Sequence, residues 1–181
     1  AYSEGLGVPF DDVARALLTP ELLSFMSKWI PGIPPGLLGC SSYFFWDDKQ
    51  DSPAHARILD FPLLGSFDKE ERVVLSKFNN SPTIFSYGSV GMPYPGLTAM
   101  NSEGVSYALH QKFTNTLNQK GTPIFELAFQ LMSEVGDKES ALEFLKKNQS
   151  ITPWGINLGF KDGSVLTAEL FGEELFYTEH Q

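Results

Sequence analysis

The spacing of short apolar runs constrains the fold of this chain more than any other feature. Between residues 40 and 113, runs rich in aromatic and β-branched residues alternate with polar turns, a pattern that predicts β-strands. The expected strands cover residues 43–46, 55–63, 72–78, 83–87, 97–100 and 105–113. The first two form a hairpin with Cys40 at one end, and a tight turn at residues 101–104 joins the last two.

The pattern changes to helical spacing after residue 121. A helix over residues 122–135 opens with a proline and stops before Gly136, a plausible C-cap, and Asp137 caps a second helix through Lys147. Strands are expected again at 154–160, 165–170 and 175–177. Strands, two helices and strands in this order predict an α+β fold with a helical layer over an antiparallel sheet.

Residues 1–39 read as a helical leader. Asp11 or Asp12 is expected to cap a short helix through Leu18, and Thr19-Pro20-Glu21 supplies the N-cap, proline and acid that start a second helix. The apolar residues of this second helix recur at helical spacing: Leu22, Leu23, Met26, Trp29 and Ile30. Consecutive prolines exclude helix from residues 31–39, which we interpret as an extended linker.

The apolar face of the leader has two interpretations. Most amphipathic helices pack on their own domain, and we favour that here. The alternative is contact with a membrane or a lipid substrate through this leader helix. The polar face argues against the alternative, because Lys28 is almost the only base on it.

The composition excludes several classes of partner. A net charge of −9 argues against nucleic acid, since phosphate binding needs clustered Lys and Arg. No stretch is long and apolar enough to span a bilayer, and a single cysteine cannot form an internal disulfide. His55, Asp60 and the acids of residues 47–51 lack the spacing of metal ligands, so neither a metal nor another cofactor is predicted.

The strongest candidate for chemistry is Cys40. A cysteine reacts as a thiolate, and a nearby cation stabilises that form. Arg57 and Asp60 lie on the expected return strand, where alternation sends them to opposite faces. Two simpler interpretations remain open: Cys40 is a buried small hydrophobe, and Arg57 with Asp60 is a structural ion pair.

Four motifs in order resemble the choloylglycine hydrolase family. They are Gly39-Cys40-Ser41-Ser42, Arg57-Ile-Leu-Asp60, Arg72-Val-Val-Leu and Ala99-Met-Asn-Ser-Glu-Gly-Val105. That family includes bile-salt hydrolases, penicillin V acylases, isopenicillin N acyltransferases and the lysosomal acylethanolamine amidase. The resemblance implies an N-terminal nucleophile hydrolase fold, in which two antiparallel sheets lie between helical layers (αββα), here in part.

The resemblance also implies roles for individual residues. Cys40 corresponds to the nucleophile, which first cleaves its own preceding bond, here Gly39–Cys40, and Arg57 and Asp60 correspond to residues that hold it. Gln111, or His110 if the register shifts by one, corresponds to an oxyanion-hole position. Residues 1–39 would then be a propeptide, and residues 40–181 the N-terminal part of the hydrolase domain.

One part of the family pattern is missing. Relatives carry a Thr-Asn-x-Pro-Thr segment and a later Arg that complete the oxyanion site, and nothing after residue 170 matches them. Residues 79–83 look similar but precede the Met-Asn motif, so the role is not transferred. We expect either that the remainder of the site lies on a separate C-terminal partner chain or is missing from this sequence, or that the site has been reduced. A homo-oligomer is the other partner that we expect.

The resulting prediction is a cysteine amidohydrolase or acyltransferase that acts on a small acyl-amide substrate, such as an N-acyl amino acid, a bile-salt conjugate, penicillin V or a fatty-acid amide. A non-catalytic relative that binds an acyl ligand or a protein is the main alternative. A Cys–His peptidase that uses Cys40 with His55 or His110 is a third.

Overall fold

The computed structural model describes residues 2–26, 29, 39–46, 53–60, 71–89, 92 and 94–180 of the 181-residue chain. These residues form the α+β fold that the sequence predicts, and all neighbouring strands pair antiparallel. Several predicted features lie outside the described residues: Lys28, Ile30, most of the linker, the turn after the first strand and the end of the return strand.

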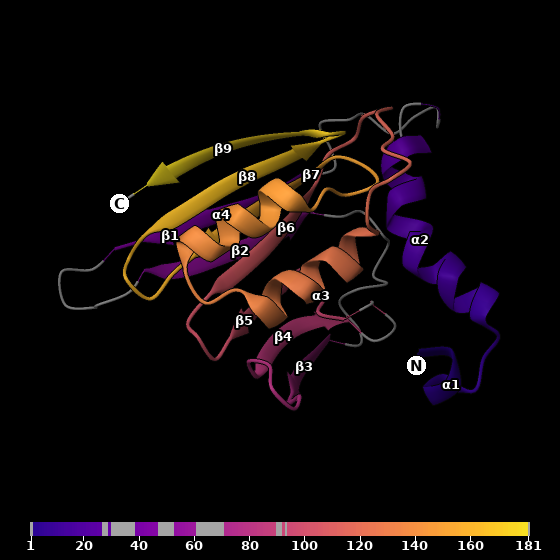
Figure 1. Cartoon of the computed structure of the whole chain (residues 1–181), viewed down its shortest axis with the longest axis horizontal. Helices are drawn as coiled ribbons and strands as arrows, with labels where there is room; N and C mark the ends of the chain where they lie inside the picture. Colours follow the sequence, from indigo (N-terminus) through magenta and orange to yellow (C-terminus); the bar gives the residue numbers. More distant parts are fainter. Residues whose placement is uncertain are drawn as a thin grey trace.

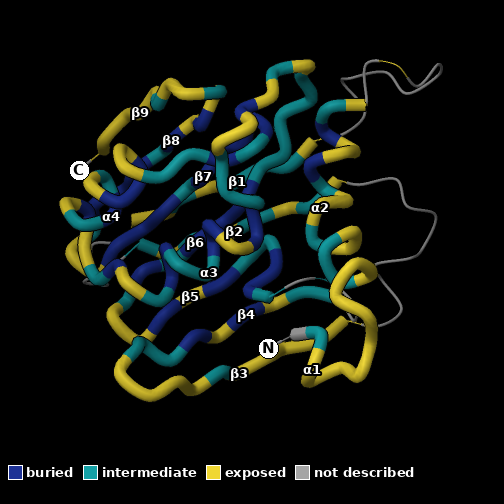
Figure 2. The backbone as a smooth tube through the Cα atoms, turned by 45° about the vertical axis from the view of Figure 1, so that its right-hand side comes forward, coloured by how far each residue is buried: buried dark blue, intermediate teal, exposed yellow. Residues whose placement is uncertain are grey.

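A large sheet forms the centre of the fold. Within the described residues it has seven strands, whose order in space is their order along the chain. They are β3 (Glu71–Ser76), β4 (Ile84–Ser89), β5 (Thr98–Asn101), β6 (Ser106–Gln111), β7 (Trp154–Gly159), β8 (Val165–Phe171) and β9 (Glu174–His180). Figure 2 shows the middle strands as the most buried and the outer strands β3 and β9 as largely exposed.

Two helices, α3 (Ile124–Glu134) and α4 (Lys138–Lys147), connect β6 to β7 and cover one face of the sheet (Figure 1). Their apolar sides pack with the inward side chains of the strands into one core. The Asp137 cap is confirmed, since its carboxylate accepts a hydrogen bond of 2.7 Å from the Ser140 backbone.

The predicted C-cap of α3 is wrong. The helix ends at Glu134, the next residue, Val135, is extended, and a buried side chain binds the carbonyls at this end instead. Asn101 Nδ2 donates to the carbonyls of Met132 (3.1 Å) and Val135 (2.8 Å), while its Oδ1 accepts from the Val105 backbone. Asn101 therefore replaces the expected Gly136 cap and ties α3 to the turn after β5.

A second sheet lies on the other face of the large sheet (Figure 1). It is the predicted hairpin, β1 (Gly39–Phe45) with β2 (Ala54–Asp60). Trp46 Nε1 donates to the Gly163 carbonyl at 2.8 Å, so the hairpin is anchored on the turn between β7 and β8. The described residues thus form three layers: helices, the large sheet and the hairpin.

The leader differs from its prediction. A short α1 (Tyr2–Leu6) precedes a continuous α2 (Phe10–Met26) that contains Pro20, so the expected break into two helices is wrong. Proline disfavours a helix interior by removing a backbone donor. Here the surrounding turn is held from outside, because Gln111 Nε2 donates to the Pro20 carbonyl at 3.0 Å.

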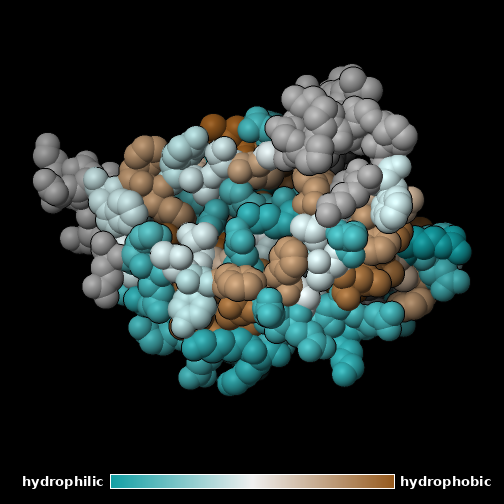
Figure 3. All heavy atoms as spheres, turned by 90° about the horizontal axis from the view of Figure 1, so that it is seen from above, coloured by the Kyte–Doolittle hydropathy of each residue, from teal (hydrophilic) through white to brown (hydrophobic). Residues whose placement is uncertain are grey.

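The face by which α2 packs is also different from the expected one. Leu22, Leu23 and Met26 are exposed, whereas Glu21 and Ser24 are buried against the domain. Figure 3 shows apolar patches at the surface on the side where α2 lies in Figure 1. The leader therefore buries the polar residues Glu21 and Ser24, while the apolar residues expected to pack stay exposed.

Candidate active site

The hairpin brings Cys40 and Arg57 together. Cys40 is opposite Leu59 and Ser42 is opposite Arg57, so Cys40 and Arg57 are diagonal neighbours on the inner face. Arg57 Nη2 lies 3.1 Å from Cys40 Sγ and 3.1 Å from the Leu109 carbonyl on β6. The thiol therefore sits half-buried between the two sheets, beside a cation that both sheets hold.

The surroundings act on the pKa of the thiol in both directions. Burial raises the pKa of Cys40, while the charge and hydrogen bond of Arg57 and a hydrogen bond from the Asp60 backbone lower it. The net effect is a raised pKa, which keeps the thiol protonated at neutral pH. The Cys40 nitrogen is in its peptide bond with Gly39, so the chain carries no free amino group beside the sulfur.

Asp60 lies at the end of the same hairpin, but on the opposite face from Arg57. Its side chain is exposed on the outer face, and the residue is paired with Gly39 across the hairpin. The predicted placement of Arg57 and Asp60 on opposite faces is confirmed by the alternating exposure of β2. In the described part of the chain no ion pair joins them, so the simpler interpretation as a structural ion pair is wrong.

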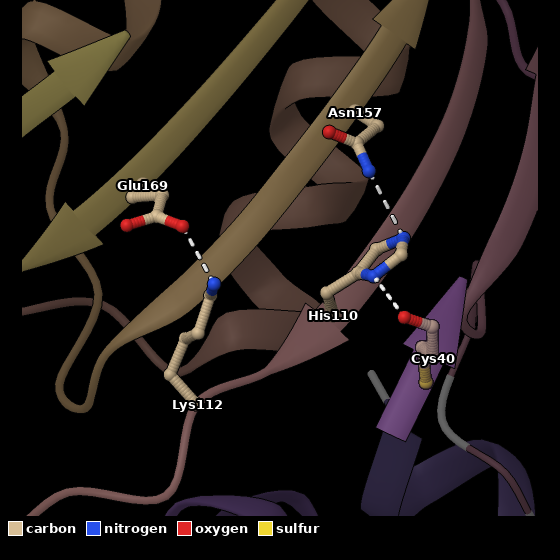
Figure 4. A network of polar contacts seen from close by, with 5 residues as sticks. All are labelled: Cys40, His110, Lys112, Asn157 and Glu169. Carbon is tan, nitrogen blue, oxygen red and sulfur yellow. Dashed lines mark hydrogen bonds and ion pairs between the residues drawn. The ribbon is translucent and has the colours of Figure 1, made fainter. Parts of the chain in front are cut away.

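His110 reaches Cys40 through the backbone rather than through the sulfur. Its Nδ1 lies 3.1 Å from the Cys40 carbonyl, and its Nε2 lies 3.0 Å from Asn157 Nδ2 and 2.7 Å from Ser42 Oγ. Figure 4 shows the ring extending from β6 between Asn157 on one side and Cys40 on the other. Burial, followed by the charge of Arg57, lowers the pKa of His110 to about 4.

His55 lies beside this cluster without touching the thiol. Its ring stacks on Phe44 with centroids 4.1 Å apart, and its Nδ1 lies 3.1 Å from Ser106 Oγ. Burial also lowers the pKa of His55 to about 4. Neither His55 nor His110 makes a hydrogen bond to Cys40 Sγ, so the geometry does not favour the Cys–His peptidase.

Gln111 is placed at the end of β6, where its side chain faces the leader. Its Nε2 donates to the Pro20 carbonyl and, at 2.9 Å, to Ser24 Oγ. The side chain is thus occupied by α2, and it makes no described contact with Cys40. The oxyanion role that the sequence suggests concerns the backbone of Gln111 and stays a prediction.

The leader is fixed next to Gln111 by a buried carboxylate. Glu21 accepts hydrogen bonds from the backbone of Ile124 (2.6 Å) and Thr152 (3.2 Å), from the Thr152 hydroxyl and from Trp154 Nε1 (3.3 Å). Burial raises the pKa of Glu21, although these donors act in the opposite direction. The sequence predicts Glu21 only as an acid in the first turn of a helix, and nothing in its spacing indicates a buried carboxylate.

Three other contributors were not predicted. Ser42 and the Leu109 carbonyl follow from the strand alternation once the register is known, but Asn157 lies in an otherwise apolar strand, where only its polarity marks it. In the described part of the chain, no cluster of three or more metal-binding side chains occurs. The helices described here include none with the length and apolarity needed to cross a membrane.

Comparison with models of known protein families and with curated proteins gives no match to this chain. The resemblance to choloylglycine hydrolases therefore stays a prediction from the four motifs.

Proposed function

We propose that the chain is the precursor of a cysteine amidohydrolase or acyltransferase of the N-terminal nucleophile type. One observation carries the proposal. The single cysteine of the chain lies at the second position of a strand, with its Sγ 3.1 Å from the guanidinium of Arg57, which the neighbouring sheet holds through the Leu109 carbonyl. A cation held in this way stabilises the negative charge that develops on sulfur when its proton leaves.

The layers of the fold support the same proposal. A helical layer, the large sheet and the β1–β2 hairpin follow one another, which corresponds to three of the four layers of an αββα sandwich. In such a fold the nucleophile opens a strand of one sheet at the interface with the other. Cys40 has that position, as the second residue of β1.

The first reaction is cleavage of the Gly39–Cys40 bond. Cys40 Sγ attacks the Gly39 carbonyl carbon, the S–C bond forms, the C–N bond breaks, and the thiol proton passes to the Cys40 nitrogen. Water then adds to the thioester and the C–S bond breaks, which leaves a carboxyl group on Gly39 and a free thiol and amino group on Cys40. The new amino group has an ordinary pKa of roughly 8 and can act as a general base.

The second reaction is turnover of an acyl amide. Sγ attacks the amide carbonyl while its proton passes to the amino group of Cys40 and from there to the leaving amine nitrogen. The acyl thioester that remains is resolved by water, which gives a carboxylic acid, or by a second amine, which gives a new amide. The oxyanion donors are proposed to include the Gln111 backbone N–H.

Intact mass after incubation in mildly acidic, reducing buffer tests the proposal. The parent chain is expected to divide into residues 1–39 and 40–181 with the addition of one water, whereas Cys40→Ala stays whole. A parent chain that stays whole under the same conditions contradicts self-processing, and it favours the non-catalytic relative that binds an acyl ligand or a protein.

A further inference from the structure

The ring of His110 is held on both edges by groups from two different strands, β1 and β7. Nδ1 faces the Cys40 carbonyl on β1, at 3.1 Å, whereas Nε2 faces Asn157 Nδ2 on β7, at 3.0 Å, and Ser42 Oγ, at 2.7 Å (Figure 4). The imidazole thus bridges the large sheet to the strand that carries the thiol. The mechanism proposed above gives this bridge no role.

The partners of His110 decide which nitrogen carries its proton. A carbonyl oxygen only accepts and an amide nitrogen only donates, so Nδ1 must hold the hydrogen and Nε2 must accept from Asn157. Ser42 can donate its hydroxyl hydrogen to the same Nε2. A proton on both nitrogens would set Nε2–H against the Asn157 donor, so the arrangement requires a neutral ring.

The charges around the ring favour the same neutral state. Arg57 on β2 and Lys112, just after the end of β6, both lower the pKa of His110, and the pKa of the nearby His55 is likewise lowered to about 4. Lys112 is paired with Glu169 on β8 at 2.6 Å, and the Cys40 thiol is a further titratable group of the same site. A second positive charge between the two sheets would lie close to Arg57.

We propose that His110 is a positioning residue for Cys40, which holds the Cys40 carbonyl through Nδ1–H in a tautomer fixed by Asn157 and Ser42. The residue acts on the backbone of Cys40 and not as a base for its thiol. The hydrogen bond to the Cys40 carbonyl fixes the orientation of the Cys40 backbone, so that its Sγ stays beside Arg57 Nη2. The consequence of this role of His110 for self-cleavage rests on the function proposed above. Its effect on the placement of the thiol does not depend on that function.

Two substitutions of the same chemistry separate the two edges of the ring. In His110→Asn the amide nitrogen takes the place of Nδ1 and can still donate to the Cys40 carbonyl. In His110→Gln the amide lies where Nε2 was, so the contacts with Ser42 and Asn157 can persist while the bond to Cys40 is lost. His180→Gln, on the exposed β9, is the matched control.

The readout is the pH dependence of alkylation by iodoacetamide, which reports on Cys40 alone because the chain has one cysteine. We expect His110→Gln to slow alkylation below the thiol pKa by about tenfold, since the rate follows the thiolate fraction. His110→Asn is expected to restore most of the parent rate. Equal rates in both variants, or slower alkylation in the Asn variant, would overturn the proposal.

The tautomer is measured independently by ¹⁵N NMR of the histidine rings. At pH 7, His110 is expected to show a protonated Nδ1 and a bare Nε2, and Asn157→Asp, which replaces the donor by an acceptor, is expected to make both nitrogens protonated. A protonated Nε2 with a bare Nδ1 in the parent chain contradicts the proposal. Neither the alkylation of Cys40 nor the tautomer of His110 requires a chain that cleaves itself. A failure of the proposed function can therefore be distinguished from a failure of this inference.

Discussion

The guanidinium of Arg57 donates across the two sheets to the carbonyl of Leu109, 3.1 Å away. The same Nη2 faces the Cys40 sulfur, so one nitrogen connects the hairpin, the large sheet and the thiol. The cation is therefore not a mobile surface charge. Its position relative to sulfur depends on how the hairpin is seated on β6.

Arg57→Met is expected to make the thiol harder to ionise. The pKa of Cys40 is already above its ordinary value because of burial, and removal of the nearest cation raises it further. We expect alkylation at pH 8 to slow by about tenfold or more, the effect of one or more pKa units. Arg72→Met, on the exposed β3, is the matched control, and an unchanged rate in the Arg57 variant would contradict the proposed coupling.

Glu21→Gln is expected to weaken the attachment of the leader. The neutral amide replaces one acceptor by a donor facing Thr152 and Trp154, and an unsatisfied buried contact of this kind costs about 1–3 kcal/mol. Urea unfolding monitored by Trp fluorescence measures the loss, with Glu134→Gln, an exposed residue of α3, as control. Equal loss in both variants would show that the buried carboxylate has no special role.

The leader also provides a pH dependence. The folded pKa of Glu21 is above the unfolded value, so the native state holds its proton more tightly. The stabilisation from this group is complete below the ordinary pKa and is lost as the pH rises through the folded one. As the pH rises across this window, we expect the parent chain to lose stability relative to Glu21→Gln, because only the parent titrates at this position. Urea midpoints of both proteins from pH 4 to 8 measure the difference, and a constant difference contradicts the shift.

His55→Phe is expected to remove a pH dependence of stability whose sign is opposite to that of Glu21. The folded pKa of His55 is about 4, below the ordinary value of 6.5, so its contribution is present above 6.5 and is lost as the pH falls toward 4. Phenylalanine keeps the stacking on Phe44 and cannot take up a proton. At pH 5 the variant should be more stable than the parent by about 1 kcal/mol, whereas at pH 8 the lost bond to Ser106 should make it equal or weaker.

Gly159→Ala is expected to separate the hairpin from the large sheet. A Cβ at this position would lie 2.8 Å from Ser106 Oγ and 2.9 Å from Phe44 Cε1, so Phe44 has to move. Overpacking of this kind costs about 1–3 kcal/mol. Gly39→Ala, where a Cβ meets nothing within 4 Å, is the control for stability, and faster alkylation of Cys40 in the Gly159 variant checks that the interface has opened.

The strands and the two central helices were predictable because their signals are local. Alternating runs between turns located β1 to β9 to within a few residues, and Asp137 marked the start of α4 by its capping side chain. The continuous α2 was not predictable, because local preference at Pro20 is outweighed by contacts from Gln111 and from the groups that hold Glu21.

The candidate site likewise has a part that the sequence predicts and a part that it does not. Alternation along β2 predicts that Arg57 and Asp60 lie on opposite faces, which the structure confirms, and the register of the hairpin then places Arg57 on the face of Cys40. Asn157 follows Cys40 by more than a hundred residues, and no spacing in the sequence connects it with His110. To predict a side-chain pair between the two sheets, one needs the register of each sheet and the way one packs on the other. The pattern of a single strand contains neither.

The sequential order of the strands in the large sheet has a consequence for the way the chain folds. Each strand pairs with its neighbour in sequence, and only α3 and α4 intervene between β6 and β7, so most of the sheet can grow from short loops, a topology associated with rapid folding. The β1–β2 hairpin is likewise local and carries both Cys40 and Arg57. The thiol and its arginine thus lie on one local hairpin, but His110 joins them only when the hairpin docks on the large sheet. Docking is therefore the step at which Cys40, Arg57 and His110 first come together.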